Sequence, residues 1–156
     1  MKNKFKIKRV HIKGGLLGGG IGAILASIFL FSGILFFLIS AGGFVGIYIV
    51  RKQIRLSYLE GLKIGLISAL TAFLYMFFLL ARSVSAAKNE ILEQGIEAYI
   101  ENHNITGVTD MQVLEDQILN YTHLGLVLQV LPVFIIMLTG TWIALIFYKP
   151  RTKKMH

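Results

Sequence analysis

The sequence predicts an all-α fold: a polytopic transmembrane helical bundle of four spans, with both termini cytoplasmic and a helical hairpin outside the membrane between spans three and four. Three observations predict it. The 156-residue chain is 55% hydrophobic, above the roughly 45–50% apolar share of soluble domains. Residues 14–50 contain no charged residue and no histidine, and basic residues flank them on both sides. Two more apolar stretches, residues 62–81 and 124–148, are each long enough to cross a bilayer. We therefore expect one integral membrane domain over residues 1–156.

The first apolar run, residues 14–50, predicts a transmembrane hairpin. A single helix of that length would reach roughly 55 Å at about 1.5 Å per residue, while the hydrocarbon core measures about 30 Å, so the run must fold back. We expect its turn at residues 31–33, where Ser and Gly interrupt the apolar sequence. A re-entrant hairpin that returns without reaching the far side predicts the same sidedness and remains an alternative. The basic residues 1–13 resemble the front of a signal peptide, but the apolar run exceeds the 7–15 residues of a cleavable segment, so we expect no cleavage.

Glycines recur at intervals of four in the predicted spans. Small residues four apart form a shallow face along which another helix backbone approaches closely, and this contact drives association in lipid. Three interpretations are open: packing between the arms of the hairpin, self-association, and a glycine-lined pore. The residues expected at such contacts are Gly14, Gly18, Gly22, Gly42, Gly46, Gly61 and Gly65.

The distribution of charge predicts the sidedness of the spans. Residues 1–13, residues 51–63 and the tail 149–156 hold 14 of the 16 basic residues. Residues 82–123 hold two basic and seven acidic residues. By the positive-inside rule the termini and the loop 51–61 are cytoplasmic, and residues 82–123 are outside.

Span three, residues 62–81, carries Lys63 at its cytoplasmic end, where the side chain can reach the headgroups. The outer segment then predicts two helices, as extensions of spans three and four, with a break at residues 102–107 and an N-cap at Thr109 for the second. In span four, Pro132 predicts a bend. The first outer helix has an acidic face that is a possible surface for a basic partner, although a solvated helix face explains it equally well. That face consists of Glu90, Glu93, Glu97 and Glu101.

The sequence lacks the usual signs of chemistry. No ionisable residue lies near the middle of a predicted span, which argues against a proton-coupled carrier or pump. Cysteine is absent, and His103 and His123 show no metal-ligand spacing, so we expect no metal site, no cofactor and no catalytic residue. The net charge of +8 comes from basic residues beside apolar spans. Anionic headgroups account for it, so we expect the lipid bilayer as a partner and not nucleic acid.

Two segments carry a resemblance to a known family. Residues 56–65 (LSYLEGLKIG) look like the start of span three in a family of small uncharacterised four-span bacterial integral membrane proteins, best represented in Bacteroidota. Residues 139–149 (TGTWIALIFYK) are similar to that family's closing span and basic tail. The resemblance implies a bacterial cytoplasmic membrane and no catalytic residues.

These observations predict a non-catalytic, multi-pass protein of the cytoplasmic (inner) membrane. We expect an accessory or assembly subunit of a larger membrane complex, in contact with other membrane proteins or with itself through its glycine-rich helix faces. A homo-oligomeric channel or holin-like permeability factor is the alternative. A membrane enzyme acting on lipids is a third hypothesis, with only the acidic outer residues and His103 in its favour.

Overall fold

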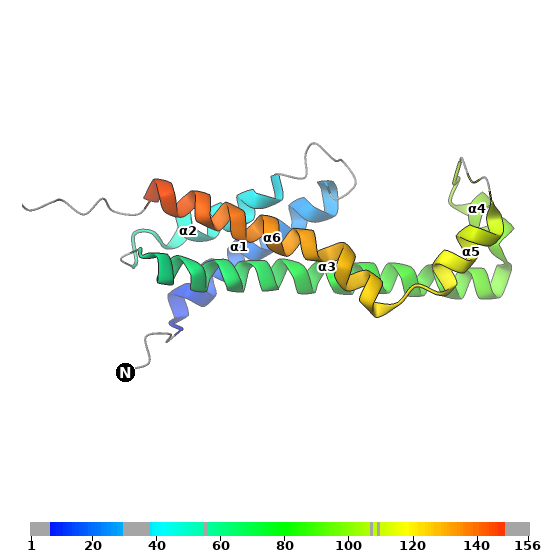
Figure 1. The fold of residues 1–156 in the computed structure, drawn as a ribbon, viewed down its shortest axis with the longest axis horizontal. Helices are drawn as coiled ribbons and strands as arrows, with labels where there is room; N and C mark the ends of the chain where they lie inside the picture. Colours follow the sequence, from blue (N-terminus) through cyan, green and yellow to red (C-terminus); the bar gives the residue numbers. More distant parts are fainter. Residues whose placement is uncertain (1–6, 30–37, 55, 107, 109, 149–156) are drawn as a thin grey trace, which may run out of the picture. The chain divides into compact units, whose positions relative to one another are not determined.

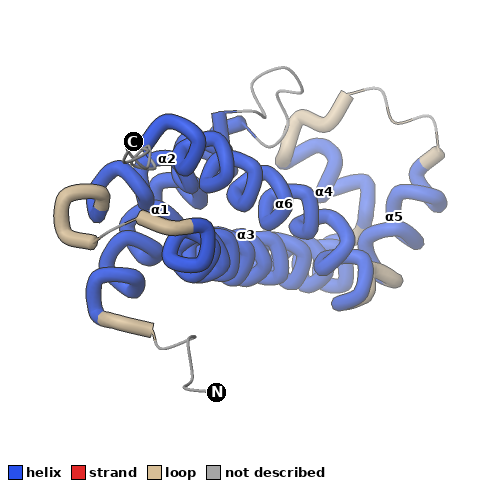
Figure 2. Tube along the Cα trace, turned by 60° about the vertical axis from the view of Figure 1, so that its left-hand side comes forward, coloured by secondary structure: helices blue, strands red, loops and turns tan. Residues whose placement is uncertain are grey.

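A computed structural model shows that the chain is all-helical over the part that it describes, as predicted. Six α-helices and no strand are found there (Figure 2). The chain divides into two compact units, which are described separately: unit 1 comprises Met1–Met76 and Val130–His156, and unit 2 comprises Phe77–Gln129. The described residues are 7–29, 38–54, 56–106, 108 and 110–148.

Unit 1 is built from α1 (Arg9–Phe29), α2 (Ser40–Val50), the first half of α3 (Tyr58–Gln94) and most of α6 (His123–Tyr148). Consecutive helices of this unit run in opposite directions (Figure 1). The start of α1, the end of α2, the start of α3 and the end of α6 therefore lie at one end of the unit. We call this the basic end, because its described cationic residues are Lys8, Arg9, Lys13, Arg51, Lys52 and Lys63.

Glycines bring α1 and α2 into backbone contact. A Cβ atom added at Gly18 would lie 2.6 Å from the Gly42 carbonyl oxygen and 2.9 Å from the Gly46 Cα. A Cβ atom at Gly14 would lie 2.7 Å from Val50 Cγ1 and 2.9 Å from the Gly46 carbonyl oxygen. Any larger residue at these positions would force the two helices apart, so the close approach depends on glycine.

The other helix pairs of unit 1 also meet at glycines. Gly19 of α1 faces Thr71 of α3, and a Cβ atom there would lie 2.7 Å from the Ser68 carbonyl oxygen. At the contact between α3 and α6, a Cβ atom on Gly65 would lie 2.8 Å from Thr141 Cγ2. Gly61 faces Leu145 of α6. The apolar core near this end consists of Ile47, Val50, Leu56, Ile64, Ala144 and Leu145.

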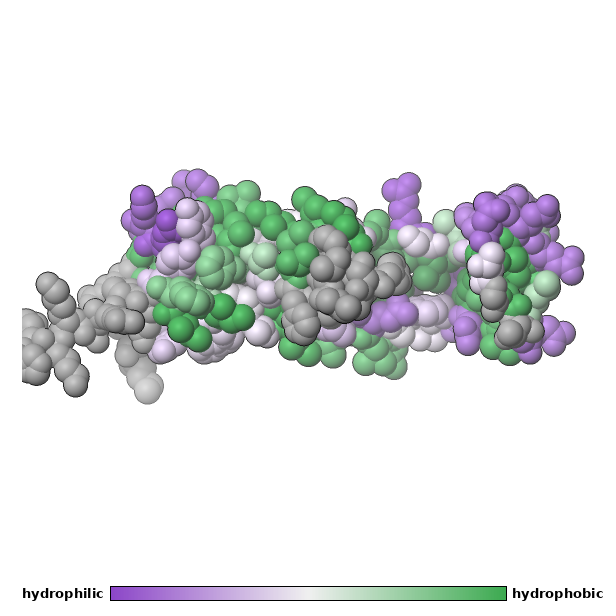
Figure 3. All heavy atoms as spheres, turned by 90° about the horizontal axis from the view of Figure 1, so that it is seen from above, coloured by the Kyte–Doolittle hydropathy of each residue, from purple (hydrophilic) through white to green (hydrophobic). Residues whose placement is uncertain are grey.

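Within the described residues, three helices are long and apolar enough to cross a membrane: α1, α3 and α6. Of the predicted second span the structure describes residues 38–50. Its 11-residue helix α2 covers only about 16 Å at 1.5 Å per residue. The predicted turn at residues 31–33 lies outside the described residues. Hydrophobic side chains cover much of the visible face of unit 1 (Figure 3), as lipid contact requires. Large exposed examples are Ile28, Leu70, Ile135, Ile146 and Phe147.

Helix α1 begins before the apolar run, so that residues 9–13 of the predicted basic N-terminal segment form its first turns. Pro132 lies inside α6, which continues as one helix through it.

Unit 2 contains the second half of α3, then α4 (Ile96–Asn102), α5 (Met111–Leu119) and the first residues of α6. The predicted extension of span three is confirmed, because α3 runs without interruption to Gln94. Gly95 then breaks the helix with a φ angle of +87°, a conformation that favours glycine. The sequence predicts a helix that continues through Gly95, and this prediction is wrong.

The second outer helix also begins and ends differently from the prediction. The side chain of Asp110 caps α5, because one carboxylate oxygen accepts from the backbone N–H groups of Gln112 at 3.0 Å and Val113 at 3.2 Å. Asp110 therefore takes the place assigned to Thr109, which lies outside the described residues. Residues 120–122 separate α5 from α6, so the second outer helix is not an extension of span four.

Candidate functional site

The predicted site residues fall in different places. The glycines named for helix packing contact other helices of unit 1, within the same chain. Three residues of the acidic face, Glu93, Glu97 and Glu101, are exposed in unit 2. The fourth, Glu90, binds two side chains: His103 Nε2 lies 3.0 Å from Glu90 Oε2, and Asn102 Nδ2 donates to Glu90 Oε1 at 3.3 Å.

A cluster of three ionisable side chains lies at the basic end of unit 1. His11 is fully buried, Lys63 is 3% exposed, and both bind the carboxylate of Glu60. The His11 Nε2 atom contacts Glu60 Oε2, while Lys63 Nζ donates to Glu60 Oε1 at 2.7 Å. Because charged groups are costly to bury unless they are paired, this arrangement allows Lys63 to lie inside the helix bundle.

The hydrogen bond at Nδ1 of His11 defines the tautomer of the imidazole ring. His11 Nδ1 lies 2.9 Å from the backbone nitrogen of Lys8, whose N–H group can only donate. Nδ1 is therefore the acceptor, and the proton resides on Nε2, which donates to Glu60. His11 is also the third residue of α1, and its bond back to Lys8 satisfies a backbone donor at the start of the helix, as the third residue of a capping box does. This bond explains why α1 begins at Arg9.

This cluster is not predicted from the sequence. His11 had been assigned to the tail, and Lys63 was expected to reach toward the headgroups. His11 and Glu60 are 49 positions apart, so no local spacing connects them. One signal was present: Glu60 is the only acidic residue of the chain outside the outer segment, and it lies three positions before Lys63.

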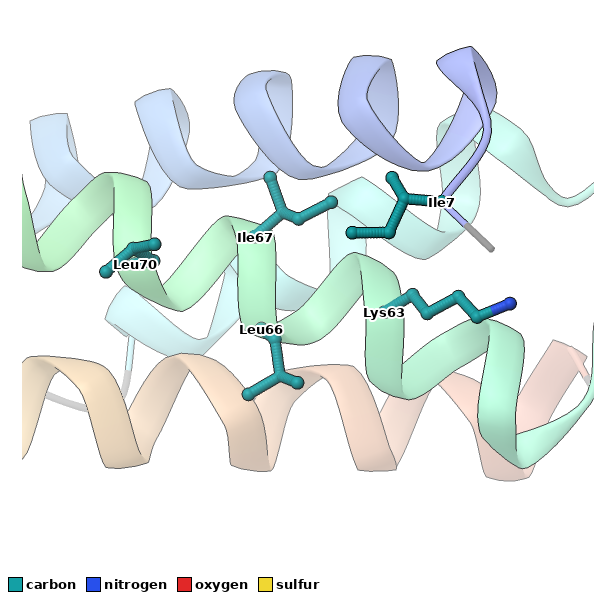
Figure 4. Close-up of a pocket in the computed structure, with 5 residues that line it drawn as sticks. All are labelled: Ile7, Lys63, Leu66, Ile67 and Leu70. Atoms are coloured by element: carbon teal, nitrogen blue, oxygen red, sulfur yellow. The ribbon is translucent and has the colours of Figure 1, made fainter. Parts of the chain in front are cut away.

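A groove of about 210 Å³ lies beside this cluster. Four of its five lining side chains are aliphatic, and the fifth is Lys63 (Figure 4). The Lys63 stem borders the groove, while its amine points away from the aliphatic side chains (Figure 4). This surface offers contact to apolar groups and no set of polar groups that would orient a reacting substrate. The aliphatic residues are Ile7, Leu66, Ile67 and Leu70.

Several hydroxyl side chains within unit 1 bind their own helices. Ser27, Thr71 and Thr141, for example, each donate to the carbonyl four residues earlier, the usual behaviour in apolar helices. The buried hydroxyl of Ser68 has no hydrogen-bond partner among the described residues and lies beside Gly18 and Gly46.

Among the described residues, no group of three or more His, Cys, Asp or Glu side chains could hold a metal ion. No family model matches the chain, and no similar protein was found among curated proteins or solved structures. The resemblance to the four-span bacterial family therefore stays a prediction.

Proposed function

We propose that this protein is a non-catalytic subunit of a larger complex in a bacterial cytoplasmic membrane. In this proposal four spans anchor it with both termini in the cytoplasm. Unit 2 then lies outside the membrane and binds a protein partner with a basic surface. The observation that carries the proposal is that neither α4 nor α5 contains a buried residue.

Helices without buried residues gain little stability from their own unit, since burial of an apolar face is the main source of helix stability in proteins. The apolar side chains of this region are exposed to a large extent: Leu92 by 72%, Val113 by 49% and Met111 by 45%. Contact with a partner would cover them. A protein is a better candidate than the bilayer, because residues 77–129 hold seven acidic and two basic residues and anionic headgroups would repel them.

The packing of unit 1 supports a subunit more than a channel. The glycine faces that would line a homo-oligomeric pore contact each other within one chain, and a Cβ atom at Gly42 would meet Gly18 and Gly22 at 2.6 Å. Helices in such close contact leave no lumen between their glycine faces. A pore lined by these faces would require the bundle to open.

Purification of the tagged full-length protein in mild detergent tests the proposal. We expect one protein to copurify in fixed stoichiometry. It should be lost when Glu93, Glu97 and Glu101 are changed together to Gln, because these exposed carboxylates lie on the proposed contact surface. The matched control is Lys52→Gln, an exposed charge at the basic end, which should leave the partner bound. Recovery of the chain alone as a homo-oligomer would contradict the proposal and favour a channel, to be tested by ion flux in liposomes.

A further inference from the structure

Arg51, at the end of α2, is held by two aromatic rings. Its guanidinium carbon lies 3.3 Å from the ring centroid of Tyr48 in α2 and 4.9 Å from that of Tyr148 in α6. Arg51 Nη1 also lies 3.5 Å from the Tyr48 carbonyl oxygen. Cation–π contacts of this kind fix the plane of the guanidinium and remove water from its face.

Arg51 has no carboxylate partner within the described residues. All eight acidic residues of the chain lie in the described part, and none forms an ion pair with Arg51. Lys63, by contrast, is neutralised by Glu60. A fixed arginine fork without a carboxylate is suited to an oxyanion from outside the chain, and phosphate matches its bidentate geometry.

The surroundings of Arg51 are aromatic and partly open. The Phe44 ring centroid lies 5.4 Å from that of Tyr148 and 6.4 Å from that of Phe147. Phe147 is 72% exposed and Tyr48 is 48% exposed. A cation and an exposed apolar surface thus lie next to each other, where α2 and α6 end. Aromatic side chains at span ends commonly lie at the headgroup level of the bilayer.

We propose that this surface binds one anionic phospholipid. Its phosphate accepts hydrogen bonds from Arg51, and its acyl chains lie against Phe44 and Phe147. A free phosphate ester has the same headgroup chemistry, but it would leave the exposed aromatic surface uncovered, and for this reason we assign the site to a lipid. The assignment does not depend on the proposed subunit role.

Native mass spectrometry of the full-length protein, with dioleoylphosphatidylglycerol titrated into the detergent micelle, tests this site. We expect Arg51→Gln to weaken lipid binding about tenfold, the effect of losing one charge-assisted contact of about 1.4 kcal/mol. The matched control is Lys52→Gln, which removes the same charge from the adjacent, exposed position and should change binding less than twofold. A third variant, Arg51→Lys, keeps the charge but loses the planar fork, so it should also weaken binding by at least about threefold.

Equal effects of Arg51→Gln and Lys52→Gln would overturn the site, because they indicate diffuse attraction to positive charge. Unchanged lipid binding in Arg51→Lys would also overturn the assignment of this site. The Arg51→Lys variant remains informative if Arg51→Gln fails to fold. Glycerol phosphate is the competitor that separates lipid from free ester. No displacement of the lipid by a hundredfold excess supports the lipid assignment, whereas full displacement assigns the site to a soluble phosphate ester instead.

Discussion

Replacing Gly18 with Ala tests whether the approach of α1 to α2 holds unit 1 together. The added Cβ atom would lie 2.6 Å from the Gly42 carbonyl oxygen, about 0.8 Å short of the 3.4 Å at which ordinary contact begins. That oxygen belongs to the backbone, so relief requires a shift of a whole helix. Overpacking of this kind costs about 1–3 kcal/mol, and we expect the free energy of unfolding of Gly18→Ala to fall by that amount.

Gly20 of the same helix supplies the control. No heavy atom lies within 4 Å of a Cβ atom built there, so Gly20→Ala meets no obstacle. This variant should be neutral or gain up to about 1 kcal/mol, because alanine favours helix more than glycine does. Both variants would be unfolded by sodium dodecyl sulfate in mixed micelles and followed by far-UV circular dichroism. If they unfold at the same mole fraction of dodecyl sulfate, the contact between α1 and α2 does not determine the stability of unit 1.

Four further predictions concern polar and backbone features. His11→Ala removes hydrogen bonds at both ring nitrogens of a fully buried residue, so the free energy of unfolding should fall by about 2 kcal/mol in the same titration; an unchanged midpoint would count against the cluster. Gly95→Ala places a side chain at a φ angle of +87°, which should cost about 1 kcal/mol and speed amide hydrogen exchange in α4. If α4 exchanges at the same rate in the variant and in the native chain, the backbone at Gly95 does not require glycine. Asp110→Ala removes the cap of α5, costs about 1 kcal/mol, and should raise exchange in the first turn of α5 only. The hydrogen bond with His103 holds the pKa of Glu90, in the part of α3 beyond the apolar stretch, below its usual range. The contact between α3 and α4 should therefore be complete above about pH 5 and be lost as the pH falls through the lowered pKa. In His103→Ala the carboxylate signal of Glu90, followed by nuclear magnetic resonance, should titrate at a higher pH than in the native chain, and an equal midpoint in both proteins would refute this cause.

The features predicted from sequence are those that a short stretch of chain encodes. Glycines four apart mark a helix contact because 3.6 residues complete one turn, and Gly14 and Gly18 meet α2 along such a row. The break after Asn102 was visible as a run of turn-forming residues, and α4 ends there. The helix boundary at Gly95 is not encoded in this way, because Gly95 lies among apolar residues at helical spacing and only its backbone angle shows the break.

The features that were missed depend on which helices meet. Nothing near His11 in the sequence indicates that Glu60 will lie against it, since that contact follows from the packing of α1 on α3. The same holds for Arg51, whose two rings come from α2 and α6. Pairing across helices requires knowledge of register and rotation, which the hydrophobic pattern of an almost entirely apolar span does not supply.

The basic end combines two kinds of positive charge, and they have different consequences for sidedness. Lys63 is buried and bound to Glu60, so it contributes little to the field that headgroups experience. Arg51 and the exposed Lys52 keep their charge at the surface. The positive-inside signal of the loop between α2 and α3 therefore depends on this pair more than on Lys63. Changing both residues to Gln should weaken the topological preference of the hairpin, whereas Lys63→Gln should affect the stability of the bundle and leave its orientation unchanged.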